Sequence, residues 1–152
     1  MTPAPKQAQS VRRTEERSAG GVVVKDGQVL VVVPKRRAAN GATVLGLPKG
    51  HIDGDETAEE AARREVREEG GVEAELLEPL GDVRYHYKRG GRLVEKHVRF
   101  FLFRYVSGTP EDHDHEIIEA RWMSLSDAAA RLTYPGERKM VGAALSKTRA
   151  DR

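Results

Sequence analysis

The sequence predicts one α+β domain, because strand-like and helical segments follow one another along its 152 residues. Three observations predict this class: an apolar hairpin pattern near the N-terminus, one strongly capped helix in the middle, and two short helical segments after the last strand. The length is typical of a single domain with one core. We therefore expect helices packed against a mixed sheet.

Composition excludes several classes of protein. There is no cysteine, so disulfides, thiolate metal sites and a cysteine nucleophile are ruled out. No apolar run approaches the roughly 18 residues of a membrane span, and we expect a cytoplasmic protein without a membrane partner. The 26 basic and 24 acidic residues leave a net charge of +2. That balance does not mark a nucleic-acid binder, so no nucleic-acid partner is expected.

The N-terminal third predicts a lead-in and a hairpin. Residues 1–17 are polar and are expected to be flexible, with the domain proper over 18–152. Strands are predicted at 21–24 and 29–33, joined by a turn that contains Asp-Gly, a strong hairpin signal. A basic loop over 34–43 and a short apolar stretch at 44–47 follow.

The clearest helix is predicted over 57–69. Thr57 and Glu60 have the spacing of a capping box, and Gly70 with Gly71 provides the stop.

The C-terminal half predicts the rest of the sheet. We expect extended chain at 72–80, strands at 83–87 and 93–105 around a turn at 88–91, and a last strand at 117–123. Short helices are expected at 125–132 and 135–145.

The central helix carries three acids on an unusual face. At about 100° per residue, Glu65, Glu68 and Glu69 project onto or beside the face formed by its alanines. Carboxylates gathered near a core repel one another and lose hydration. Bound Mg²⁺ or Mn²⁺, which prefer oxygen ligands, would relieve this. The alternative is a solvated acidic helix end with Arg64 as partner.

The stretch from Gly50 to Val72 carries a specific motif. It reads Gly, five residues, Glu, seven residues, then Arg-Glu-Val-Arg-Glu-Glu-Gly-Gly-Val. This resembles the Nudix box at every specified position, and the chain is identified by that resemblance as a Nudix hydrolase. The resemblance implies an α/β/α sandwich around a mixed β-sheet.

The same resemblance assigns roles within the box. It implies Glu65, Glu68 and Glu69 as metal ligands, joined by the carbonyl of Lys49 or Gly50. Arg64 would orient the glutamates, and Glu56 would brace the loop. The general base is Glu65, Glu68 or a loop acid, for which Glu116 is the candidate, also as a further ligand. A zinc pair of His113 and His115 is the less favoured alternative, because three glutamates specify a hard metal.

Family chemistry implies attack of water on a diphosphate linkage in a nucleoside-diphosphate-linked substrate. The segments 47–51, 96–102 and 132–135 resemble those of Nudix enzymes that cleave diadenosine polyphosphates. By strand alternation, Glu95, His97 and Arg99 share one face. The residues expected to bind substrate are Arg36, Lys49, His51, His97, Arg99 and Tyr85, with Arg37 and Lys88 as further phosphate contacts and Tyr87 and Tyr134 as further base contacts.

Several alternatives stay open at this point. The substrate class includes oxidised nucleoside triphosphates, inositol pyrophosphates and ADP-ribose. A non-catalytic domain that senses a nucleotide is the competing function, although such domains usually have damaged boxes and this box is intact. The oligomeric state is expected to be monomer or homodimer.

Overall fold

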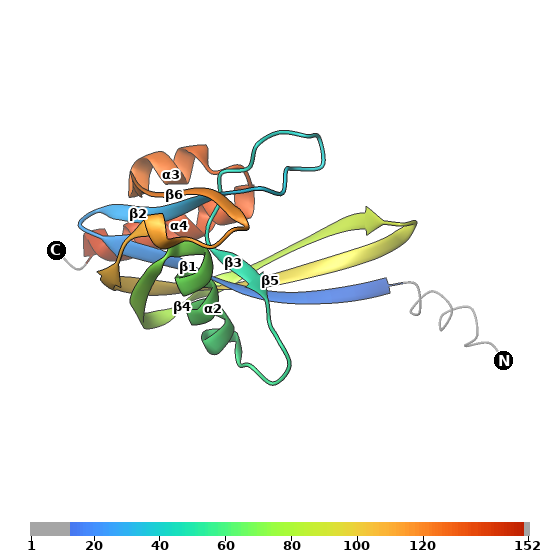
Figure 1. Ribbon diagram of the computed structural model, residues 1–152, viewed down its shortest axis with the longest axis horizontal. Helices are drawn as coiled ribbons and strands as arrows, with labels where there is room; N and C mark the ends of the chain where they lie inside the picture. Colours follow the sequence, from blue (N-terminus) through green and yellow to red (C-terminus); the bar gives the residue numbers. More distant parts are fainter. Residues whose placement is uncertain (1–12, 151–152) are drawn as a thin grey trace.

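The computed structural model describes residues 13–150, which form one mixed sheet between helices on its two faces (Figure 1). The elements in chain order are β1 (Arg13–Lys25), β2 (Gln28–Pro34), β3 (Lys49–His51), α2 (Ala58–Gly70), β4 (Val72–Arg89), β5 (Arg92–Gly108), the 3₁₀ turn η1 (Pro110–Asp112), β6 (Ile117–Ser124), α3 (Leu125–Arg131) and α4 (Pro135–Ala150).

The sheet has the strand order β4-β5-β1-β2-β6, with the short β3 paired to β1 off this path. Strands β1 and β5 are parallel, and the other pairs are antiparallel. The predicted mixed sheet is therefore confirmed.

Each face of the sheet has its own core. On one face, Ala61, Ala62 and Val66 of α2 pack with Phe101 and Phe103 of β5. On the other face, α3 and α4 cover Val22, Val98 and Phe100 among others. The strands are buried on both faces, as expected of a sheet between two helical layers. This confirms the expected sandwich.

The N-terminal hairpin forms as predicted. Asp26 and Gly27 both have positive φ, at 50° and 78°, and Val24 pairs with Val29 across the turn. Two consecutive left-handed residues are what a tight hairpin turn requires, which explains the Asp-Gly pair.

The structure differs from the prediction at residues 13–17. These residues begin β1 and pair in parallel with residues 93–97 of β5, so the lead-in expected over 1–17 is wrong there; residues 1–12 lie outside the described residues. The cause is a hydrogen-bonded partner strand 80 residues away, which local composition does not reveal. Together with β4 and β5 this segment forms an arm that extends beyond the helices (Figure 1).

Two other segments are longer than predicted. The extended chain at 72–80 and the strand at 83–87 are one strand, β4, whose register against β5 shifts at three places. Helix α4 continues past 145 to residue 150. Bulges let a long strand bend without ending, and they broke the apolar alternation on which the prediction relied.

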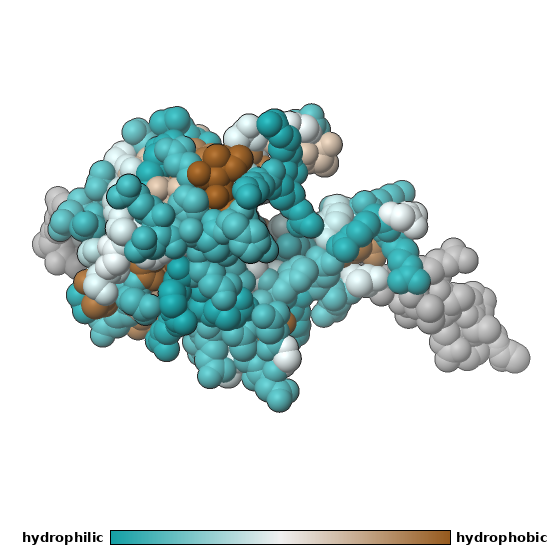
Figure 2. Space-filling model, in the orientation of Figure 1, coloured by the Kyte–Doolittle hydropathy of each residue, from teal (hydrophilic) through white to brown (hydrophobic). Residues whose placement is uncertain are grey.

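The surface is mostly polar. The face in Figure 2 is largely hydrophilic, with scattered apolar side chains. Among the helices within residues 13–150, none has both the length and the hydropathy to cross a membrane.

Candidate active site

A pocket of about 580 Å³ lies where β3, α2 and the loop after β2 meet. That volume is in the range of small-molecule sites. Its charged walls fall into two groups, which we call the acidic group and the basic group. The acidic group is Asp53, Glu65, Glu69 and Glu116, and the basic group is Lys35, Arg36, Arg37, Lys49 and Lys96.

Helix α2 supplies two of the acids because its apolar face is turned to the sheet. The predicted capping box fixes its start, with Thr57 accepting from the Glu60 N–H and Glu60 accepting from the Thr57 N–H. It ends at the left-handed Gly71. Glu65 shares the buried face and is only 8% exposed. Glu69 lies one turn further on and also lines the pocket.

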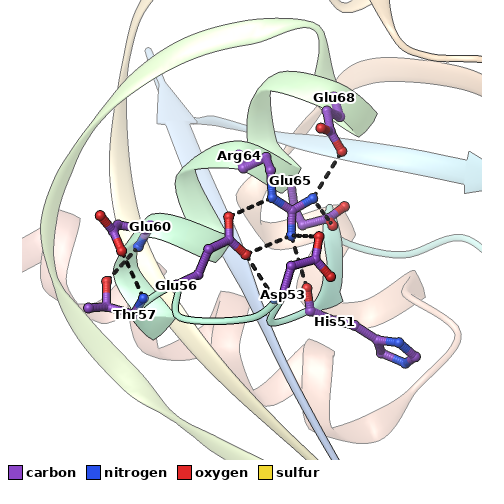
Figure 3. Close-up of polar contacts among 8 residues, drawn as sticks. All are labelled: His51, Asp53, Glu56, Thr57, Glu60, Arg64, Glu65 and Glu68. Carbon is purple, nitrogen blue, oxygen red and sulfur yellow. Dashed lines mark hydrogen bonds and ion pairs between the residues drawn. The ribbon is translucent and has the colours of Figure 1, made fainter.

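Arg64 organises the loop before the helix (Figure 3). Its guanidinium makes a two-pronged contact with Glu56, at 2.7 and 3.0 Å, and donates to the His51 carbonyl at 2.9 Å. The Glu56 carboxylate also accepts the Asp53 N–H at 2.9 Å. These hydrogen bonds, above all those from Arg64, lower the pKa of Glu56 to about 2. Glu56 therefore stays ionised and braces the loop against the helix.

The same arginine engages two of the three predicted ligands. Arg64 donates to Glu65 at 2.9 Å and to Glu68 at 3.1 Å. Glu68 is the outermost of the three, with its side chain 47% exposed, and it is absent from the pocket lining. Arg64 thus partners Glu65 and Glu68 but not Glu69, and the alternative of a solvated acidic helix end does not describe Glu65, which is buried.

Burial opposes ionisation of the two inner acids. Desolvation raises the pKa of Glu65 to about 7, against the opposing pull of Arg64. Desolvation also raises the pKa of Glu69 to about 8, although Glu69 accepts the Lys49 N–H at 3.1 Å. Two carboxylates that need a counter-charge therefore stand side by side in the pocket wall.

Gly50 allows β3 to pass directly over Glu65. A Cβ placed on Gly50 would lie 2.2 Å from Glu65 Oε2, closer than any contact that real Cβ atoms make. The backbone at Lys49 and Gly50 therefore runs against the carboxylate, where a peptide carbonyl can join a set of oxygen ligands.

The donor chemistry of the acidic group fits a hard divalent cation, since its side chains offer carboxylate oxygens. Within residues 13–150, however, no three acidic or histidine side chains already converge as a ready-made cage. The reason lies in their present partners: Arg64 holds Glu65 and Glu68, and the Lys49 N–H holds Glu69. Binding a cation would require these carboxylates to turn from those partners.

The pocket wall also contains two tyrosines, Tyr85 and Tyr134, together with the basic group. Lys49 Nζ lies 2.7 Å from Glu137 and 5.6 Å from the centre of the Tyr134 ring. Burial alone would lower the pKa of Lys49, but Glu137 raises it above its ordinary value. Burial lowers the pKa of Lys96, and the neighbouring Lys49 adds to that effect. Tyr85 completes the wall.

The structure brings most of the predicted substrate residues together. Arg36, Lys49, His51 and Tyr85 line the pocket as expected. Lys96 and Glu137 were missed. The strand pattern could have predicted Lys96, because residues two positions apart share a face and Lys96 lies between the buried Val94 and Val98 on theirs. Glu137 has no such signal, since its partners are about 90 residues away.

Two predicted substrate residues are not in the pocket. His97 and Arg99 lie on the other face of β5, where both approach Asp82 at 3.4 and 2.9 Å. His97 and Arg99 do share one face of β5, as predicted. That face points away from the pocket, however, and the opposite face places Lys96 in the pocket lining. Lys88 and Tyr87, predicted as further contacts, are likewise absent from the lining, and the Tyr87 hydroxyl donates to Glu16 at 2.8 Å.

The histidine and acid loop before β6 contributes Glu116. Its N–H donates to Asp114 at 3.0 Å, and its carbonyl accepts the Lys35 N–H at 2.9 Å. These bonds fix the backbone beside the pocket. His115 lines the pocket, whereas His113 does not and contacts the Asp114 carbonyl. The alternative zinc pair is therefore not assembled.

Comparison with known proteins matches most of the chain to one family. A family model described as NUDIX domain matches residues 14–143. The putative mutator protein MutT4 of Mycobacterium tuberculosis is 37% identical over 137 residues, covering 86% of this chain and 55% of that protein. The chain thus spans about half the length of that relative. The RNA pyrophosphohydrolase of Erythrobacter litoralis is 30% identical over 151 residues, covering 88% of this chain and 91% of that protein.

A solved structure shows the same fold. The crystal structure of a MutT NUDIX hydrolase from Burkholderia pseudomallei aligns with a TM-score of 0.71 at 27% identity, covering 86% of this chain and 98% of that chain.

Proposed function

Since the chain belongs to the Nudix family, we propose that it is a divalent-metal-dependent hydrolase that cleaves a diphosphate linkage in a nucleoside-diphosphate-linked substrate. One observation carries the proposal: buried carboxylates and lysines share a single pocket. Cleavage of a polyphosphate requires positive charge around its oxygens, which the lysines supply. It also requires a divalent cation beside the scissile bond, which the carboxylates would bind.

The acids of α2 are the proposed metal ligands. Glu65, Glu68 and Glu69 would hold Mg²⁺ or Mn²⁺, with the carbonyl of Lys49 or Gly50 as a further ligand. The cation would supply neutralisation of phosphate oxygens and acidification of water. Without the cation, Arg64 is the shared hydrogen-bond donor of Glu65 and Glu68, which would turn from it to bind the cation.

Glu116 is the proposed general base. Glu65 and Glu68 are each engaged by Arg64. Glu116 lines the same pocket, and its carboxylate makes no hydrogen bond or ion pair with the residues that the structure describes. It can therefore accept the proton of the attacking water. Glu65 and Glu68 are the alternatives. If Glu116 is the base, Glu116→Gln lowers kcat at saturating metal without raising the metal concentration that half-saturates the rate, whereas loss of a further metal ligand raises that concentration; an unchanged kcat favours Glu65 or Glu68.

The basic group supports a long polyphosphate chain. Lys96 has no ion-pair partner among residues 13–150, and it lines the same pocket as Arg36 and Lys49, whose positive charges lower its pKa further. Each phosphate oxygen can accept a charge-assisted hydrogen bond from such groups. We therefore propose a diadenosine polyphosphate as the substrate, with Tyr85 or Tyr134 against one base.

An oxidised nucleoside triphosphate is the second candidate. The pocket offers aromatic rings for one base only, at Tyr85 and Tyr134. A relative named 8-oxo-(d)GTP phosphatase, from Mycolicibacterium smegmatis, is 35% identical over 95 residues, covering 62% of this chain and 28% of that protein.

A substrate panel tests the proposal. Purified protein is incubated with Mg²⁺ or Mn²⁺ and diadenosine tetra- to hexaphosphates, 8-oxo-dGTP, a 5′-triphosphorylated RNA, inositol pyrophosphates and ADP-ribose, and products are resolved by chromatography. We expect the diadenosine polyphosphates to have the highest kcat/KM. Glu69→Gln is the matched negative control. Binding of nucleotides without cleavage of any would instead support the sensing function.

A further inference from the structure

Glu137 is a buried carboxylate outside the Nudix box. It lies in the first turn of α4 and is 3% exposed. Its two oxygens have separate partners: Oε1 accepts the Leu47 N–H at 3.0 Å, and Oε2 lies 2.7 Å from Lys49 Nζ. A buried carboxylate is tolerated only when its oxygens are satisfied in this way.

The segment from Leu45 to Lys49 is held from the same side. The Leu45 N–H donates to Thr133 Oγ1 at 2.8 Å, and the Thr133 N–H donates to the Leu45 carbonyl at 2.9 Å. Glu137 Oε1 lies only 3.0 Å from where a Cβ on Gly46 would be. The backbone leading to Lys49 is therefore fixed against the start of α4.

Lys49 connects the two groups of the pocket. Its N–H donates to Glu69 at the acidic group. Its ammonium lies at the basic group, between Glu137 and the Tyr134 ring. A lysine side chain has four flexible bonds and loses considerable rotamer entropy when it is fixed. A fixed ammonium in the pocket wall therefore requires a strong partner, and Glu137 is that partner for Lys49.

We propose that Glu137 is a positioning residue that acts through Lys49, holding its ammonium where a polyphosphate chain binds. The inference rests on the proposed function, since it assumes that the basic group binds phosphate. A lysine already fixed in the pocket binds an anion without the loss of side-chain entropy that a free lysine incurs.

Glu137→Gln isolates this role. The amide oxygen can replace Oε1 and keep the Leu47 hydrogen bond, while the amide NH₂ then replaces Oε2 and points a donor at the ammonium. The change also removes a negative charge from beside the pocket. If the lost negative charge dominates, an anion binds Glu137→Gln more tightly than the wild type. If the lost positioning of Lys49 dominates, the anion binds the variant more weakly. The sign of the effect therefore separates the two roles.

The experiment measures binding of inorganic tripolyphosphate by calorimetry in EDTA, so that neither metal nor turnover is involved. We expect Glu137→Gln to raise Kd about tenfold, Lys49→Gln to raise it at least as much, and the double variant to match Lys49→Gln. Glu78→Gln is the control, because Glu78 is also paired with a lysine, Lys147 at 2.8 Å, but lies outside the pocket.

The outcomes separate the inference from the function on which it rests. Unchanged or tighter binding by Glu137→Gln, or losses that multiply in the double variant, overturns the positioning role. Absence of tripolyphosphate binding by the wild type overturns the phosphate role of the basic group and the inference with it. If Glu137→Gln does not fold, Glu137→Asp, which keeps the charge but shortens the side chain, is measured instead, with weaker binding again expected.

Discussion

Lys96 and His97 are neighbours in β5 whose side chains serve opposite faces of the sheet. Lys96 lines the pocket, whereas His97 approaches Asp82 on the other face at 3.4 Å. The alternation of a strand thus separates a lysine that faces the pocket from a histidine that faces Asp82.

Replacing each of these neighbours with alanine tests that separation. Lys96→Ala is expected to raise KM about tenfold, the effect of losing roughly 1.5 kcal/mol of charge-assisted hydrogen bonding, with kcat within about threefold. His97→Ala is expected to leave KM unchanged. Steady-state kinetics of both variants would show the assignment to be wrong if the effects were reversed.

Gly50→Ala tests the contact between β3 and Glu65. The new methyl would lie 2.2 Å from Glu65 Oε2, so either the strand or the carboxylate must move. We expect kcat to fall at least about 10²-fold, because a small misplacement of a catalytic group is costly. Gly142→Ala in α4 is the control, since its Cβ would meet nothing within 4 Å. Equal activity of both variants would contradict a site at Glu65.

Glu69→Gln is expected to stabilise the metal-free protein at high pH. The pKa of Glu69 is raised to about 8 by burial, whereas an unfolded glutamate titrates near its usual value of about 4.3. Ionisation therefore destabilises the fold increasingly as pH rises from about 4.3 to 8. In EDTA the variant should melt at least about 2 °C higher than wild type at pH 8.5 and equally at pH 4.

Added Mg²⁺ should reverse that order, because only the wild type gains a full set of ligands. Thermal denaturation at the two pH values, with and without Mg²⁺, checks both statements. A wild type that is more stable than Glu69→Gln in EDTA at pH 8.5 would refute the buried-charge account.

The length of the polyphosphate chain should matter through Arg36 and Lys49. The double variant Arg36→Ala/Lys49→Ala is expected to lower kcat/KM about tenfold more for diadenosine hexaphosphate than for ADP-ribose, since the longer chain offers more oxygens to cations. A competition assay with both substrates measures this ratio directly. An equal loss for both would place these residues outside the chain-binding site, and a wild-type preference for ADP-ribose would overturn the substrate proposal alone.

The sequence was sufficient to predict those features that depend on interactions between residues close together in the chain. The Thr57–Glu60 capping box, the Asp26–Gly27 turn and the helical face that buries Glu65 depend on residues a few positions apart. Each was predicted correctly for that reason.

Long-range pairing decided what the sequence missed. Residues 13–17 are a strand because β5 lies beside them, and Glu137 reaches Lys49 and Leu47 from almost 90 residues away. The direction of the Lys96 face depends on which side of β5 meets the pocket. Alternation defines two faces but does not say which of them is occupied by a ligand.

Metal dependence of turnover is the most direct test of a hydrolase built on the acids of α2. Diphosphate cleavage is measured in EDTA and then across a titration of Mg²⁺ or Mn²⁺, for wild type, Glu65→Gln and Glu69→Gln. The account predicts no turnover in EDTA, saturable recovery in the wild type, and kcat at least about 10²-fold lower in both variants. Full wild-type turnover in EDTA, or variants that recover to wild-type rates at the same metal concentration, would contradict it.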